Sequence, residues 1–205
     1  MTVAGQLYLV APAISDAALA AAVRGGVDLV QLRLKDASDE EILATAARFR
    51  AVLDPLGVPL IINDRPDLAR AAGAAGVHVG QDDQAVSDAR AIVGADAIVG
   101  LSTHTPEQVD AAADLPLDYF AVGPVYATPT KPGRPAVGTE LVRYAAARAQ
   151  LPFFAIGGID PTNLAVVRDA GAERIAVVRA ITQAPDPERA ARALAHVMRR
   201  DVEPA

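Results

Sequence analysis

Eight short β-rich segments alternate with longer, alanine-rich stretches along the chain, and this alternation constrains the fold more than any other feature. The predicted strands are Gln6–Val10, Asp28–Leu34, Pro59–Ile62, Val77–Val79, Ala97–Leu101, Tyr119–Val122, Phe153–Ile156 and Arg174–Val178. The intervening stretches have helical spacing, as in Ser38–Leu53 and Asp88–Val93. Four polar residues stand where helices are expected to begin, namely Ser15, Ser38, Thr105 and Asp160. Strands that alternate with helices pair in parallel through right-handed crossovers.

The chain length favours one closed architecture over an open one. A chain of 205 residues suits an α/β fold, a single-domain (β/α)8 TIM barrel over residues 1–205. An open, doubly wound sheet is the alternative, but no dinucleotide-binding glycine fingerprint follows the first strand. The longest irregular stretch, Gly123–Gly138, contains four prolines. Loops of that length in a compact domain are often functional.

Composition excludes several kinds of chemistry and partner. The chain has no cysteine, which rules out disulfides, thiolate metal sites and cysteine nucleophiles. A formal net charge of −6 argues against non-specific nucleic-acid binding but not against small anionic ligands. No apolar run approaches the roughly 20 residues of a membrane helix, and the first residues do not resemble a signal peptide. We therefore expect a cytoplasmic protein without nucleic-acid or membrane partners; a homo-oligomer remains open.

Polar residues gather at the predicted carboxyl ends of the strands, where barrels of this type place their active sites. Alternation along the second strand puts Gln31, Arg33 and Lys35 on one face, away from Leu32 and Leu34. Two cations and an amide on an inward face call for anionic partners. These are either a ligand or carboxylates of an internal ion network.

Two carboxylates on neighbouring strand ends suit a metal ion. Asp64 follows Asn63 at the end of the third strand, and Asp83 follows the fourth. Carboxylates beside a cationic cluster suit Mg²⁺ that keeps several waters and bridges phosphate oxygens. Taken singly, Asp64 could be a turn residue before Pro66, and Asp83 a helix cap.

Hydroxyl groups and a lysine follow the fifth and sixth strands. Ser102 lies outside any G-x-S-x-G nucleophile motif, so it is interpreted as a hydrogen-bonding residue, and His104 as a support for its loop. Thr128, Thr130 and Lys131 occupy the proline-rich loop and suggest binding of an oxyanion.

Glycines and a further arginine follow the last two strands. Gly157 and Gly158 end the seventh strand, and Val178 and Arg179 end the eighth. The loops after these strands often form a phosphate site from backbone amides. A phosphate site here and a metal-and-cation site on strands two to six predict two phosphorylated substrates, or one substrate with two anionic ends.

The motifs together resemble the thiamine-phosphate synthase family, in the family's order, from Gln31 to Ile181. The matching segments are QLRLKD at 31–36, IND at 62–64, VHVGQDD at 77–83, GLSTH at 100–104, GPV at 123–125, TPTK at 128–131, AIGGI at 155–159 and IAVVRAI at 175–181. The resemblance implies a Mg²⁺-dependent transferase on a TIM barrel. Such an enzyme joins a hydroxymethylpyrimidine diphosphate to a thiazole phosphate, giving thiamine phosphate and pyrophosphate by dissociation.

The resemblance also implies a role for each matching residue. The pyrimidine diphosphate would be bound by Gln31, Leu32, Arg33, Leu34, Lys35, Asn63, Ser102 and Lys131. The thiazole phosphate would be bound by Thr128, Pro129, Thr130, Gly158, Val178 and Arg179. Asp64 and Asp83 would hold Mg²⁺, while Lys131, Ser102 and Arg33 would act on the reacting groups.

One residue departs from the family pattern, which often has serine where this chain has Arg179. Three other functions remain open: a thiazole tautomerase that uses a histidine near the position of His104, a non-catalytic protein that binds thiamine precursors, and another phosphate-using barrel enzyme. A tautomerase has no need of the Gln31, Arg33 and Lys35 set or of two metal carboxylates, and a pure binding protein could lose Lys131, Asp64 and Asp83.

Overall fold

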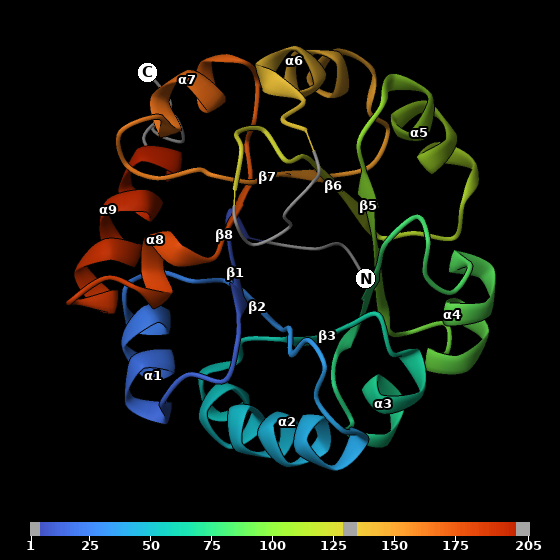
Figure 1. Cartoon of the computed structure of the whole chain (residues 1–205), viewed down its shortest axis with the longest axis vertical. Coiled ribbons are helices and arrows are strands. Elements are labelled where there is room, and N and C mark those ends of the chain that lie inside the picture. Colours follow the sequence, from blue (N-terminus) through green and yellow to red (C-terminus); the bar gives the residue numbers. More distant parts are fainter. Residues whose placement is uncertain (1–4, 129–134, 200–205) are drawn as a thin grey trace.

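The computed structural model describes residues 5–128 and 135–199, which form a closed barrel of eight parallel strands in sequential order (Figure 1). The strands are β1 Leu7–Ala11, β2 Leu29–Leu32, β3 Leu60–Asn63, β4 Gly76–Val79, β5 Ile98–Thr103, β6 Tyr119–Val122, β7 Phe153–Ile156 and β8 Ile175–Val177. Closure comes from pairing of β1 with β8, where Leu7 lies opposite Ile175. The predicted TIM barrel is confirmed.

Helices surround the barrel on its outer face (Figure 1). They are α1 Asp16–Arg24, α2 Asp39–Leu53, α3 Pro66–Ala71, α4 Val86–Val93, α5 Pro106–Ala111, α6 Gly138–Arg148, α7 Leu164–Asp169, α8 Arg179–Thr182 and α9 Pro187–Arg199. Short 3₁₀ turns follow α2 at Asp54–Leu56 and α5 at Ala112–Asp114. Within the described residues, no helix is both long enough and apolar enough to cross a membrane.

Three of the four predicted helix caps are confirmed, and the fourth is wrong. Ser15, Ser38 and Thr105 each accept a backbone N–H bond in the first turn of α1, α2 and α5. Asp160 does not cap α7, which begins four residues later. Its carboxylate instead accepts bonds from the backbone and hydroxyl of Thr162, at 2.8 and 2.6 Å. A carboxylate of this kind stabilises a turn as readily as a helix start.

Alternating side chains divide the core into two layers. Outward-facing residues such as Leu9, Val30 and Phe120 pack between the strands and the helices. A separate cluster fills the inside of the barrel: Tyr8, Leu29, Ile61, Ile98, Tyr119, Phe154 and Ala176. Each member stands at the first or second position of its strand. These side chains therefore form a floor at the amino-terminal end of the strands and leave space above it.

Three aromatic rings make up much of this floor. The ring centroids of Tyr8 and Phe154 lie 5.1 Å apart, those of Tyr119 and Phe154 5.4 Å, and those of Tyr8 and Tyr119 5.9 Å. All three pairs meet edge to face, the arrangement that aromatic rings prefer. The three rings are almost fully buried and pack directly against one another.

Candidate active site

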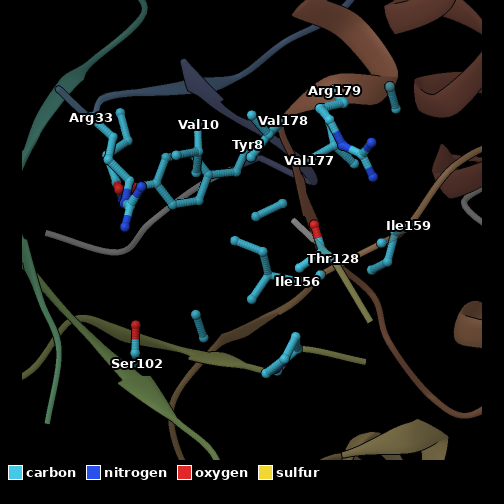
Figure 2. A pocket seen from close by; sticks show the side chains of 18 of the residues that line it. Tyr8, Val10, Arg33, Ser102, Thr128, Ile156, Ile159, Val177, Val178 and Arg179 are labelled. Atoms are coloured by element: carbon cyan, nitrogen blue, oxygen red, sulfur yellow. The ribbon is translucent and has the colours of Figure 1, made fainter. Parts of the chain in front are cut away.

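A cavity of about 320 Å³ opens above the floor, at the carboxyl ends of the strands. Figure 2 shows Arg33 on one side and Arg179 on the other, with Val10, Ile156 and Ser102 between and around them. Arg33 directly follows β2, and Arg179 begins α8 one residue after β8 ends. The cavity therefore has a positively charged group at each of two separate positions.

A row of hydrogen-bonded side chains crosses the barrel beneath the cavity. The Gln31 amide donates to the Tyr8 hydroxyl at 2.6 Å, and the hydroxyls of Tyr8 and Tyr119 lie 2.9 Å apart. His78 Nδ1 lies 3.0 Å from the Tyr119 hydroxyl, and His78 Nε2 lies 2.9 Å from Ser102 Oγ. All five side chains are buried, and burial raises the pKa of both tyrosines. Both tyrosines therefore keep their hydroxyl hydrogens at neutral pH.

Sequence reasoning identified only the two ends of this row, Gln31 and Ser102. Tyr8, His78 and Tyr119 were missed, although each is a polar residue at an inward-facing position of its strand. Gly100 on β5 makes room for them, because a Cβ there would lie 2.2 Å from Tyr119 Cζ and 2.6 Å from His78 Nδ1. A glycine beside inward tyrosine and histidine residues was the signal that could have found the row.

The two predicted metal-binding carboxylates do come together. Asp64 lies against Asp83, and its oxygen accepts a hydrogen bond from the Asn63 amide. Burial, followed by the hydrogen bond and repulsion with Asp83, raises the pKa of Asp64 to about 6, while Asn63 and the Arg33 charge oppose the rise. Asp64 also has a φ of 62°, a left-handed conformation that few non-glycine residues adopt. Uncommon backbone geometry of this kind is frequent at functional sites.

Asp83 is held by the turn after β4. Its Oδ2 accepts the backbone N–H of Gly80 at 2.8 Å. A Cβ at Gly80 would lie 2.6 Å from that oxygen, so the turn brings the carboxylate close only because residue 80 is glycine. Within the described residues, no group of three or more His, Cys, Asp or Glu side chains could hold a metal ion. The candidate metal site therefore has two carboxylates.

The turn after β7 forms the wall beside Arg179. Gly157 and Gly158 have φ values of 107° and 65°, and the Gly158 carbonyl accepts a bond from Asn163 Nδ2 at 2.8 Å. A Cβ at Gly158 would lie 2.7 Å from Tyr126 Cβ. Thr128 approaches from the loop after β6 and lines the same wall, as do Val178 and Ile159 (Figure 2). The predicted glycine, threonine, valine and arginine thus meet at one end of the cavity.

Several residues predicted to bind the substrates are not among the described residues that line the cavity. The Leu32 side chain is buried in the outer core, and Leu34 packs against that core. Lys35 is exposed, because β2 ends at Leu32 and the chain turns at Asp36, where φ is 58°. The predicted inward face of this strand therefore stops at Arg33. Pro129, Thr130 and Lys131 lie outside the described residues.

His104 lines the cavity but is engaged with its own loop. Its Nδ1 is hydrogen-bonded to the carbonyl of Gly123, and its backbone N–H donates to Gln108 Oε1 at 2.7 Å. The ring thus ties the end of β5 to the end of β6, which agrees with the supporting role predicted for it.

The closed barrel and the cavity at the carboxyl ends of its strands define a TIM-barrel enzyme. Comparison with known proteins identifies which one. A family model described as thiamine monophosphate synthase matches residues 7–181. The chain belongs to the thiamine-phosphate synthase family, and it is a transferase of thiamine biosynthesis.

Individual relatives agree with this assignment. The thiamine-phosphate synthase of Thermus thermophilus is 54% identical over 174 residues, 84% of each chain. That of Acidothermus cellulolyticus is 53% identical over 182 residues, covering 88% of this chain and 84% of its own. The solved thiamine phosphate pyrophosphorylase from Pyrococcus furiosus superposes with a TM-score of 0.88 at 26% identity, covering 97% of both chains. A 3-hexulose-6-phosphate synthase, at TM-score 0.67 and 23% identity, shares the fold.

Proposed function

We propose that the enzyme joins 4-amino-2-methyl-5-hydroxymethylpyrimidine diphosphate to 4-methyl-5-(2-phosphoethyl)thiazole, or its carboxylated form. The bond between the pyrimidine methylene carbon and the diphosphate oxygen breaks, and the thiazole nitrogen forms a new bond to that carbon. The products are thiamine phosphate and pyrophosphate, and the carboxylated thiazole also loses its carboxyl group as carbon dioxide. The observation that carries the proposal is the placement of Arg33 and Arg179 at two separate sides of one cavity (Figure 2). Two anionic substrates need two such positions.

The pyrimidine diphosphate belongs on the side of β2 and β3. Arg33 and Asn63 line the cavity there and offer N–H donors to phosphate oxygens. Gln31 and Ser102 lie deeper, at the floor, where a flat ring can reach them. Lys35 is exposed near this mouth, and it would act only on the outer part of the diphosphate.

The carboxylate pair fits a magnesium ion. Burial, followed by the contact with Asp83, raises the pKa of Asp64, and a divalent cation between the two carboxylates would stabilise both in their charged form. Two carboxylates with waters and phosphate oxygens are a common ligand set for Mg²⁺. Bound there, the ion would neutralise charge on the departing diphosphate. Arg33, whose charge already acts on Asp64, would share that task.

The thiazole phosphate belongs at the opposite end. The Gly157–Gly158 turn lets the backbone approach a ligand closely, and Thr128 and Arg179 add a hydroxyl and a guanidinium. Pro129, Thr130 and the backbone of Val178 would also bind this phosphate. The guanidinium of Arg179 stands where related enzymes often have serine, and it can bind two phosphate oxygens at once.

The reaction needs stabilisation of the leaving group more than a nucleophile from the protein. Arg33 and Lys131 would bind the developing pyrophosphate charge, and the buried floor would shield the pyrimidine-methyl cation from water. Residues 1–205 would work as one catalytic domain. Its cytoplasmic location, its oligomeric state and its lack of nucleic-acid partners stay predictions.

Release of pyrophosphate from the purified protein tests this proposal. Release should require Mg²⁺ and both substrates, and thiamine phosphate should form in equal amount. Omission of each component in turn is the control. Isomerisation of the thiazole phosphate alone, without pyrophosphate release, would instead identify a tautomerase and make His104 the next residue to replace.

A further inference from the structure

The row of hydrogen bonds beneath the cavity has both of its ends at the ligand site. Gln31 on β2 and Ser102 on β5 line the cavity, as do Tyr8 and His78 between them, and Tyr119 joins Tyr8 to His78 from below (Figure 2 shows Tyr8 and Ser102). Every link is between 2.6 and 3.0 Å. Each connecting group carries a single hydrogen that it can donate. The hydrogens in such a row must all point the same way.

The direction follows from the Gln31 amide nitrogen, which can only donate. The Tyr8 oxygen accepts from Gln31, so the Tyr8 hydrogen needs an acceptor of its own, because a buried hydroxyl without one is costly. Tyr119 is the acceptor at 2.9 Å, and its own hydrogen then goes to His78 Nδ1. Because Nδ1 accepts that hydrogen, His78 carries its own ring hydrogen on Nε2, which donates to Ser102.

We propose that this row, running from Gln31 through Tyr8, Tyr119 and His78 to Ser102, fixes the hydrogen-bonding polarity of the cavity floor. Gln31 turns its carbonyl oxygen to the ligand as an acceptor, and Ser102 turns its hydroxyl hydrogen to the ligand as a donor. His78 holds the Nε2–H tautomer and acts as a positioning residue. It does not act as a base toward Ser102, although the pair resembles half of a catalytic triad.

The polarity selects the ligand ring, a consequence that rests on the proposed function. A 4-aminopyrimidine offers an amino group as donor and ring nitrogens as acceptors, which match Gln31 and Ser102. A 4-oxopyrimidine has the opposite pattern, with a carbonyl acceptor beside a ring N–H donor. The floor therefore favours the amino form, since a mismatched ring leaves buried polar groups unpaired.

Nitrogen NMR of the ligand-free protein tests the row without any substrate. The chain has only three histidines, so His104→Gln and His196→Gln variants assign the His78 signals. Long-range proton–nitrogen spectra should show an unprotonated Nδ1 and a protonated Nε2 for His78. In Tyr119→Phe, which removes the donor to Nδ1, the nitrogen shift of Nδ1 should move to that of an imidazole nitrogen that accepts no hydrogen bond. A protonated Nδ1 in the wild type would reverse the row and overturn the proposal.

Substrate discrimination provides the second test. The ratio of kcat/KM for the 4-amino over the 4-oxo pyrimidine diphosphate should fall roughly tenfold in Tyr8→Phe, because the Gln31 amide becomes free to turn over. Tyr144→Phe, which removes an exposed hydroxyl bonded to Asp110, is the matched control and should keep the ratio. An equal loss for both substrates in Tyr8→Phe would reduce the row to a structural role. If the wild type releases no pyrophosphate, the proposed function fails, and the NMR result still decides the tautomer.

Discussion

Replacing Asp64 with asparagine should stabilise the magnesium-free protein at neutral pH. In the folded chain, burial and the neighbouring Asp83 raise the pKa of Asp64 from 3.8 to about 6. The ionised carboxylate therefore opposes folding, and the asparagine amide does not. Asparagine also tolerates the left-handed backbone at this position, where φ is 62°, and it can still accept the hydrogen bond from Asn63.

The size of the expected stabilisation follows from the pKa shift of Asp64. A pKa difference of about 2 units between folded and unfolded states corresponds to at most about 3 kcal/mol. Asp64 is only partly buried, so solvent screening reduces this figure, and we expect about 1 kcal/mol. For a chain of this length, that corresponds to a rise of about 2–4 °C in the melting temperature.

The direction of the Asp64 pKa shift determines how the stability difference between the variant and the wild type depends on pH. Below pH 3.8 the carboxyl group is protonated in both states, so asparagine gives no advantage. Between pH 3.8 and about 6 the folded protein alone keeps the proton, and the wild type loses stability relative to the variant as the pH rises. Above about 6 the advantage of the variant is complete.

Urea unfolding in EDTA, at pH 8 and near pH 4, measures this difference. Asp39→Asn is the control with the opposite sign, because Arg65 holds the pKa of Asp39 below its usual value. Adding Mg²⁺ should stabilise the wild type more than Asp64→Asn. If Asp64→Asn is no more stable than the wild type at pH 8, the carboxylates do not repel each other and the metal assignment loses its support.

Four further substitutions test the proposed site. Asp83→Ala should abolish Mg²⁺-dependent turnover with the barrel still folded, as judged by circular dichroism; full activity would remove the metal assignment. Lys131→Ala should lower kcat more than it raises KM, and the opposite pattern in steady-state kinetics would make Lys131 a uniform binding residue. Arg179→Ala should raise KM for the thiazole phosphate by roughly tenfold with little change for the pyrimidine, as expected for loss of a charged hydrogen bond. Gly158→Ala is strained at φ 65° and crowded by Tyr126, so it should lower the free energy of unfolding in urea by about 1–3 kcal/mol and weaken binding of the thiazole phosphate. An unchanged KM for the thiazole phosphate would show that this turn does not bind the phosphate group.

Much of the fold could be predicted because apolar residues recur with a different spacing in strands than in helices. The alternation specified eight parallel strands, and β6 and β7 have the predicted bounds. Strand ends were less predictable. Continued alternation placed Lys35 on the inward face, but β2 ends at Leu32 and the turn at Asp36 leaves Lys35 exposed. Local turn geometry, rather than hydrophobic pattern, sets where a strand stops.

The candidate site was predictable only where residues lie close in the sequence or match the family motifs. Asp64 and Asp83 could be paired because the carboxyl ends of neighbouring parallel strands meet at one edge. The contacts of Tyr8 with Tyr119 and of Tyr119 with His78 depend on barrel closure, which brings β1, β4 and β6 to one interior. Apart from Gly100, whose missing side chain leaves room for Tyr119 and His78, nothing in the sequence indicates these contacts.

The aromatic floor also gives the protein a built-in optical reporter. The chain contains no tryptophan and four tyrosines, and two of these, Tyr8 and Tyr119, lie directly beneath the cavity. Tyrosine emission therefore cannot be lost by energy transfer to an indole, and it responds to changes in the hydrogen bonding of the phenol groups. A pyrimidine ring bound as proposed on Gln31 and Ser102 would alter the row that contains both phenols. Its arrival should then change the tyrosine emission of the unlabelled enzyme.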